Sequence, residues 1–146
     1  MVKHKGQLVG YVRVSTVDQN TERQLEGMKL VKVFTDKASG KDTKRPQLKA
    51  VLDYLREGDT LVVDSTGFND QTWLDRAGNF HSEALHLVER FRPVSPDLLD
   101  YQVTIEDPNV FTRPWNIRMP LYRRQDVGAQ LLEFKCVEFV EELMYG

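Results

Sequence analysis

The chain has 146 residues, of which 40% are hydrophobic, 29% charged and 10% aromatic, and its formal net charge is -2. This composition excludes a disordered chain, a collagen-like repeat and a membrane-spanning protein, and it predicts a soluble fold of one ordinary domain or two small ones. The first residues lack the apolar core of a signal peptide, and the single cysteine, Cys136, has no partner for an internal disulfide. We therefore expect a cytoplasmic protein.

Charge and composition divide the chain near residue 64. Residues 1–64 carry a net charge of +3 and residues 65–146 a net charge of -5. Such a shift predicts two parts, an α/β half over 1–64 and a β-rich half over 65–146, which pack separately or as one domain.

The first half alternates predicted strands and helices. Nearly continuous apolar runs over 8–14, 31–34 and 61–63 predict three strands covered on both faces. A capping box over 21–24 predicts a short helix between the first two strands, with Leu25 and Met28 facing inward. A second helix is indicated by apolar residues at helical spacing between Pro46 and Gly58, namely Leu48, Val51, Leu52 and Leu55. This order predicts a parallel sheet with a site at the carboxyl ends of its strands.

The second half has the alternation of antiparallel strands. Four segments fit this pattern, at 85–91, 101–106, 115–121 and 131–137, with turn signals at 92–96 and 107–109. Residues 137–144 have helical spacing. The predicted fold class is therefore α+β, with a truncated parallel α/β unit followed by an antiparallel meander and a short C-terminal helix.

Polar residues gather at the predicted strand ends. They are Tyr11, Arg13, Ser15, Gln19, Asp36 and Arg45. A serine hydroxyl attacks a phosphodiester only where cations stabilise the charge of the transition state, and Arg13 and Arg45 are suited to that task. Two simpler interpretations stay open: Ser15 caps a helix, and Arg13 pairs with Asp36.

Three ordered segments carry a family resemblance. Gly10–Gln19, Phe34–Gly40 and the run from Arg45 to Val63 resemble the N-terminal catalytic domain of the resolvase/invertase serine recombinases. In that family a serine attacks DNA and forms a 5′-phosphoserine link. The resemblance implies that Ser15 is the nucleophile and that Arg13 and Arg45 bind phosphate. The supporting site residues are then Tyr11, Gln19, Gln24 and Asp36.

Three departures from the family pattern favour a vestigial site. After the third strand the family continues with a Leu-Asp-Arg-Leu-Gly-Arg type of segment, whereas residues 64–70 are Asp-Ser-Thr-Gly-Phe-Asn-Asp. Nothing after residue 64 has the pattern of the family's long dimerisation helix or of its DNA-binding helix-turn-helix. The connection over 26–32 is also shorter than usual. Loss of several charge contacts predicts little catalysis.

The second half carries another resemblance. Residues 58–75, 81–91, 103–108 and 112–115 resemble the C-terminal part of an uncharacterised β-rich bacterial protein family, which implies no known activity. The two resemblances overlap at Glu57–Val63. This overlap predicts a recombined or generated chimera joined at that segment.

Other residues of the second half suggest no further chemistry. His81, Glu83 and His86 are possible zinc ligands, but a strand would place His86 on the opposite face from the other two. We therefore expect no metal and no cofactor. Cys136 is predicted to be a buried structural thiol. Four aromatic residues are assigned to core packing or a protein interface rather than to nucleobase stacking, namely Trp73, Phe80, Phe111 and Trp115.

The leading sequence-based interpretation is a noncatalytic binding protein. It would inhibit a nucleic-acid-processing partner, as antitoxins and anti-CRISPR proteins do, with an unknown protein as the favoured partner, DNA as a weak one and no membrane. One alternative is a DNA strand-cleaving serine recombinase that uses Ser15 as its nucleophile. A second alternative is a chimera with no evolved activity.

Overall fold

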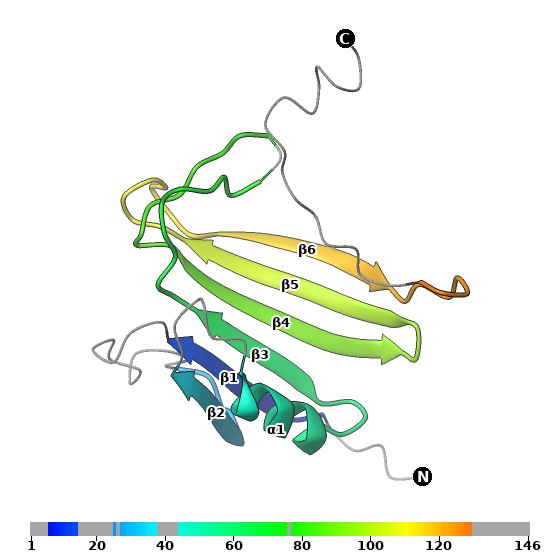
Figure 1. Cartoon of the computed structure of the whole chain (residues 1–146). Coiled ribbons are helices and arrows are strands. Elements are labelled where there is room, and N and C mark those ends of the chain that lie inside the picture. The colour runs from blue at the N-terminus through cyan, green and yellow to red at the C-terminus, as the bar shows by residue number, and fades with distance from the viewer. Residues whose placement is uncertain (1–5, 15–24, 26, 38–43, 76, 130–146) are drawn as a thin grey trace.

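Six strands and one helix make up the described part of the chain (Figure 1). The computed structural model describes residues 6–14, 25, 27–37, 44–75 and 77–129. The elements are β1 (Leu8–Val14), β2 (Lys32–Lys37), α1 (Pro46–Tyr54), β3 (Thr60–Ser65), β4 (His86–Ser95), β5 (Leu98–Glu106) and β6 (Trp115–Tyr122).

The strands form a single sheet in the order β2-β1-β3-β4-β5-β6. β1 pairs in parallel with β2 on one side and with β3 on the other, as the sequence predicts for the first half. From β3 onward each neighbouring pair is antiparallel. β3 therefore joins the parallel and the antiparallel parts of the sheet.

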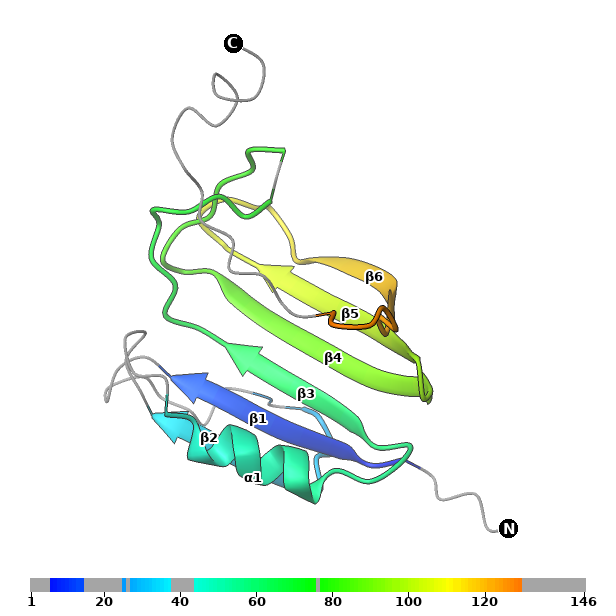
Figure 2. The same cartoon turned by 45° about the vertical axis from the view of Figure 1, so that its right-hand side comes forward.

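The helix α1 covers one face of the parallel strands (Figure 2). Val9 and Tyr11 of β1, Phe34 of β2 and Val51 of α1 form the buried core between them. Alternate residues of a strand face opposite sides of the sheet, so Arg13 lies on the same face as Val9 and Tyr11. The predicted phosphate-binding residue Arg13 is thus on the face of the sheet that α1 covers.

The opposite face of the parallel strands has its own core. Val12 and Val62 pack there against Leu25, with Met28 at the edge of the cluster. Gly10 leaves room for this contact, because a Cβ atom at that position would lie 2.8 Å from Cδ1 of Leu25. Both faces of β1 are consequently covered, which explains its nearly continuous apolar sequence.

The antiparallel part buries its apolar residues on the face that α1 also covers. Leu85, Val103 and Ile105 form a third cluster, and Phe68 and Leu74 from the connection between β3 and β4 pack against it. The alternation predicted for 101–106 is confirmed in this respect. Val103 and Ile105 are buried, while Glu106 is exposed.

Two local expectations are wrong. Leu25 has a φ of 63° and lies in a turn, and Met28 belongs to no helix, so neither residue lies on the predicted helix, although both pack in the second core as expected. β4 runs through the expected turn at 92–96, and the hairpin turn falls at Pro96 and Asp97, because Arg92 and Pro93 still pair with β5. The predicted helix behind Pro46 is present as α1, and of the apolar residues that indicate it Leu52 is 57% exposed.

Several predictions fall on residues that the structure does not describe. These are the helix from residue 21 to 24, the strand over 131–137, the C-terminal helix and the environment of Cys136. The meander with a fourth strand and a terminal helix therefore stays a prediction. What is confirmed is a mixed α/β sheet with mostly strands and few helices.

The predicted boundary at residue 64 falls inside β3. The described part of the chain has no helix long and apolar enough to cross a membrane.

Candidate functional site

Four of the predicted site residues lie at one end of the parallel strands. Tyr11 and Arg13 belong to β1, Asp36 belongs to the adjoining strand β2, and Arg13 is the register partner of Asp36. Arg45 directly precedes α1. The remaining three, Ser15, Gln19 and Gln24, lie outside the described residues.

Asp36 links β1, β2 and the start of α1. Its side chain is 4% exposed. Oδ2 accepts a hydrogen bond from the hydroxyl of Tyr11 at 3.0 Å and another from the backbone N–H of Leu48 at 3.0 Å. Oδ1 accepts one from the backbone N–H of Gln47 at 3.2 Å. A carboxylate at a helix N-terminus satisfies N–H groups that have no partner within the helix, so Asp36 caps α1 from a neighbouring strand.

The pKa of Tyr11 shows how the charges of the site are arranged. Burial and then the adjacent Asp36 raise the pKa of Tyr11 to about 12, whereas the positive charges of Arg45 and Arg13 act in the opposite direction. Both guanidinium groups therefore lie within electrostatic range of the Tyr11 hydroxyl. This hydroxyl stays protonated at neutral pH and serves as the hydrogen-bond donor to Asp36.

Arg13 differs from the expectation of a simple ion pair. No ion pair joins it to Asp36 among the described residues, since that carboxylate is used by Tyr11 and by the start of α1. Nε of Arg13 is buried and has no hydrogen-bond partner in the described ranges. A buried guanidinium N–H group without a protein partner is suited to donate a hydrogen bond to a bound anion.

Arg45 stands at the N-cap position of α1. Its backbone has φ -127° and ψ 70°, and Pro46 follows at the first helical position. Nη1 of Arg45 donates to the carbonyl of Lys44 at 3.4 Å. The cap by Asp36 fixes the beginning of the helix and thereby the position from which the Arg45 side chain extends.

The arrangement suits the recognition of a phosphate group. Arg13 lies on β1, two residues before Ser15, Arg45 lies at the N-cap of α1, and the positive charges of both act on the Tyr11 hydroxyl. Positive groups of this kind stabilise the charge that develops during phosphoryl transfer. Within the described residues no group of three or more His, Cys, Asp or Glu side chains could hold a metal ion.

The two histidines of the second half have other partners. His81 precedes β4 rather than lying on a strand, and its Nε2 is 3.1 Å from Oγ1 of Thr72. His86, on β4, has Nε2 at 3.0 Å from Oδ2 of the fully buried Asp64 and Nδ1 at 3.7 Å from Glu106.

The four aromatic residues divide into two pairs. Phe111 and Trp115 pack edge to face, with ring centroids 5.6 Å apart, beside the third core cluster. Trp73 and Phe80 form an isolated backbone bridge, but their exposures are 74% and 64%. Trp73 and Phe80 therefore lie outside the core, and for these two residues the alternative of a protein interface stays a prediction. In the connection between them, the side chain of Asn79 donates a hydrogen bond to Asp75 at 2.7 Å.

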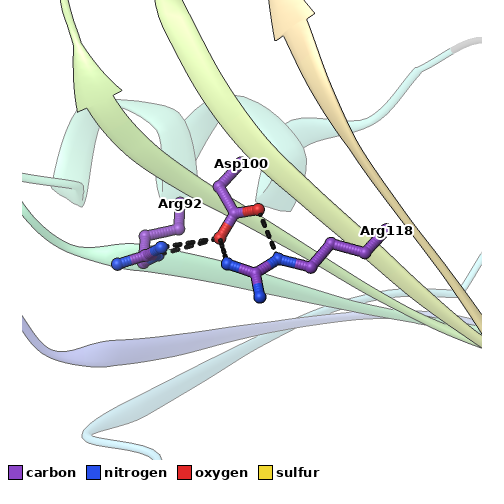
Figure 3. Close-up of polar contacts among 3 residues, drawn as sticks. All are labelled: Arg92, Asp100 and Arg118. Atoms are coloured by element: carbon purple, nitrogen blue, oxygen red, sulfur yellow. Dashed lines mark hydrogen bonds and ion pairs between the residues drawn. The ribbon is translucent and has the colours of Figure 1, made fainter.

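Sequence reasoning missed a charge cluster on β4, β5 and β6. Asp100 accepts hydrogen bonds from Arg92 and Arg118 (Figure 3). The available signal was a pair of opposite charges, Arg92 and Asp100, placed symmetrically about the turn at Pro96 and Asp97. Because the sequence signals predict the turn at 92–96, they do not predict that Arg92 and Asp100 are paired across neighbouring strands.

Comparison with known proteins identifies relatives of one kind. The family described as "Resolvase, N terminal domain" matches residues 8–108, more than half of the chain. The chain is 67% identical over 61 residues to the transposon Tn501 resolvase of Pseudomonas aeruginosa. The aligned segment covers 42% of this chain and 33% of the resolvase. It is 49% identical over 89 residues to a DNA-invertase of Enterobacteria phage P7, covering 58% of this chain and 43% of the invertase.

A third relative, the serine recombinase gin of Escherichia phage Mu, is 44% identical over 89 residues, which cover 58% of this chain and 42% of gin. The chain thus spans less than half the length of each of these curated relatives. No solved structure matches it.

These findings correct the leading sequence-based interpretation. The relatives are named as resolvases, invertases and a recombinase, so the expectation of a noncatalytic inhibitor with a protein partner is wrong. The expectation that DNA is only a weak partner is wrong for the same reason.

The family match also bears on the predicted junction. Its range contains residues 57–63 and continues to residue 108, and no finding supports a chimera or a second family. The chain belongs to the family of resolvase N-terminal domains.

Proposed function

We propose that this chain carries the DNA strand-cleaving part of a serine recombinase, with Ser15 as the nucleophile. The observation that supports this most strongly is the buried Nε of Arg13, which has no hydrogen-bond partner among the described residues and lies on β1, two residues before Ser15. Arg45, at the N-cap of α1, is the second positive charge that acts on the neighbouring Tyr11. The names of the relatives supply DNA as the substrate.

The proposed reaction is a transesterification. The Oγ atom of Ser15 attacks a backbone phosphorus atom, a bond forms between that oxygen and the 5′-phosphate, and the bond to the 3′-oxygen breaks. The serine proton is lost, and the departing oxygen gains a proton to become a 3′-hydroxyl. Arg13 and Arg45 bind the non-bridging oxygens, whose negative charge increases in the transition state.

Asp36 and Tyr11 act as positioning residues in this proposal. Asp36 holds the start of α1, which carries Arg45, against the end of β1, and Tyr11 donates to the same carboxylate. Gln19 and Gln24 are assigned supporting roles on the strength of the family resemblance alone.

The segment after β3 limits the expected rate. Residues 64–70 lack the family's Asp and Arg pattern, and Phe68 of that segment packs against the antiparallel core. Loss of one preorganised charge contact typically costs about 2.7–4 kcal/mol of transition-state stabilisation. We therefore expect slow cleavage, so that detection of the covalent intermediate needs long incubation. A cytoplasmic location, where DNA is accessible, is part of the same proposal.

The test is the formation of protein-linked DNA. The chain is incubated with a diverse library of negatively supercoiled plasmids, denatured and analysed for covalent complexes. Wild-type protein and the neighbouring-hydroxyl control Thr16→Ala are expected to form the complex, and Ser15→Ala is not. Equal complex formation by Ser15→Ala, or none by wild-type protein after long incubation with the library, contradicts the proposal.

A further inference from the structure

A cluster of one carboxylate and two guanidinium groups lies across β4, β5 and β6 (Figure 3). Oδ2 of Asp100 accepts from Nη2 of Arg92 at 2.6 Å and from Nη2 of Arg118 at 2.9 Å. Oδ1 accepts from Nε of Arg118 at 2.8 Å. The contact with Arg118 is thus bidentate, the geometry that fixes a guanidinium plane most firmly.

A third arginine lies on the same face of the sheet. Arg90 is two residues before Arg92 on β4, so both side chains point to the same side. Arg90 and Arg118 both pair with Gln102 in the strand register, one from each neighbouring strand. We call Arg90, Arg92 and Arg118, with Asp100 among them, the arginine patch.

The arginine patch lies on the opposite face from α1 and from the third core cluster. Val103 and Ile105 of β5 point into that cluster, and Asp100 and Gln102 alternate with them along the strand. The side chains of Arg92 and Arg118 are 54% and 65% exposed. Among the described residues these two guanidinium groups are therefore accessible to a partner, whereas Arg90 is half-buried and its guanidinium also contacts Oγ1 of Thr104 and Sδ of Met28.

The charge of the arginine patch is positive in a half of the chain that is otherwise acidic. Three guanidinium groups stand against one carboxylate, a net charge of +2, whereas residues 65–146 together carry -5. The guanidinium groups of Arg118 and Arg92 hold the pKa of Asp100 at about 2, so this carboxylate is ionised at every physiological pH.

The geometry points to the DNA backbone as the ligand of the arginine patch: we infer that Arg90, Arg92 and Arg118 bind backbone phosphates outside the cleavage site. This inference rests on the proposed function, which supplies DNA as the partner. Each guanidinium has five N–H donors, and Asp100 uses only part of those on Arg92 and Arg118.

Asp100 prepares the patch for that role. It orients two guanidinium groups before binding, which reduces the conformational entropy that they lose on contact with phosphate. Neighbouring strands are about 4.8 Å apart, so Arg90 and Arg118, two strands apart in one row, are separated by about 10 Å and can reach different phosphates.

The test measures noncovalent binding to a labelled duplex of mixed sequence in the Ser15→Ala background. The patch variant is Arg92→Gln with Arg118→Gln. The matched control is Arg123→Gln with Arg124→Gln, which removes two exposed arginines that pair with Asp97 and Asp126. The affinity is followed by fluorescence anisotropy over a range of salt concentrations.

The patch variant is expected to bind about tenfold or more weakly, with a salt slope reduced by about 2, one for each phosphate that an arginine no longer neutralises. The control is expected to stay within about twofold of the parent, because Arg123 and Arg124 lie after β6 and outside the patch. Equal reductions in the affinity of the patch variant and the control would overturn the inference and indicate attraction by net charge alone.

A third variant tests the charge of Asp100. Asp100→Asn keeps the three arginines and one side-chain oxygen that can still accept a hydrogen bond from them, and it removes the negative charge, so it is expected to bind DNA at least as tightly as the parent. A loss of binding with Asp100→Asn as large as that of the patch variant would contradict the phosphate role. Failure of the Ser15 adduct assay leaves these binding outcomes unchanged, so the two proposals fail separately.

Discussion

The buried carboxylate of Asp64 on β3 bonds to the imidazole of His86 on β4, with 3.0 Å between Oδ2 and Nε2. Oδ1 of Asp64 has no hydrogen-bond partner in the described part of the chain. Asp64 is the register partner of Val12 on β1 and of Val88 on β4. The Asp64–His86 hydrogen bond therefore links β3 to β4, where the parallel part of the sheet meets the antiparallel part. It also gives the buried carboxylate of Asp64 a polar partner.

The first prediction concerns pH. Asp64 raises the pKa of His86 through the hydrogen bond, against the effect of burial, and the charges of Asp64 and Glu106 add to the rise. A raised pKa in the folded state means that the protonated imidazole stabilises the fold. That contribution is complete below the unfolded pKa of about 6.5 and is lost as the pH rises through the higher folded pKa.

Urea unfolding at a series of pH values measures this effect. The free energy of unfolding of the wild-type protein is expected to fall between pH 6.5 and the folded pKa, and that of His86→Gln to change less over the same window. Parallel pH profiles for the two proteins would show that His86 does not carry the dependence.

The second prediction concerns the cap of α1. Asp36→Ala removes the acceptor for Gln47, Leu48 and Tyr11, and loss of a capping side chain costs about 0.5–2 kcal/mol before the buried Tyr11 hydroxyl is counted. Tyr11→Phe removes a single hydrogen bond and is expected to cost about 0.5–1.5 kcal/mol. Chemical denaturation of both variants checks the order, and an Asp36→Ala variant as stable as wild type would contradict it.

The third prediction contrasts two neighbouring residues of α1. Val51 is fully buried and Leu52 is 57% exposed. Val51→Ala creates a cavity and is expected to lower the free energy of unfolding by about 2 kcal/mol, whereas Leu52→Ala is expected to stay within about 0.5 kcal/mol of wild type. If Leu52→Ala lowered the free energy of unfolding more than Val51→Ala, the helix face that contains Leu52 would be the one packed against the sheet, which would contradict the prediction.

The fourth prediction separates the two tryptophans. Trp73 is 74% exposed, and Trp115 is half-buried against Phe111. The single-tryptophan variant Trp115→Phe, which keeps Trp73, is expected to be quenched by acrylamide much more strongly than Trp73→Phe, which keeps Trp115. Similar quenching constants would place Trp73 in a protected environment.

The sequence predicts those parts of the fold that depend on local pattern. The strands at 8–14 and 101–106 follow from apolar runs and alternation, and α1 follows from apolar spacing behind Pro46. Local pattern is insufficient where distant residues decide. The space beside Gly10 admits the Leu25 side chain, and Leu25 itself adopts a positive φ.

The candidate site shows the same division. The family resemblance names Arg13, Asp36 and Arg45, but the role of Asp36 as the cap of α1 depends on the packing of α1 against β2. The hydrogen bonds of Asp100 likewise depend on the register of the β4–β5 hairpin. The sequence signals predict the turn of this hairpin too early, at 92–96, and so do not pair Arg92 with Asp100. Ion pairs between strands are set by tertiary pairing, which a single sequence specifies only weakly.

The role of Ser15 as the nucleophile is tested most directly by identifying the residue that becomes linked to DNA. The covalent complex is digested with nuclease and trypsin, and the peptide over 14–23, which contains Ser15, Thr16 and Thr21, is fragmented by mass spectrometry. We predict a nucleotide attached through its 5′-phosphate to Ser15. A nucleotide on any other side chain, or an unmodified peptide from a sample that contains the complex, would contradict this role.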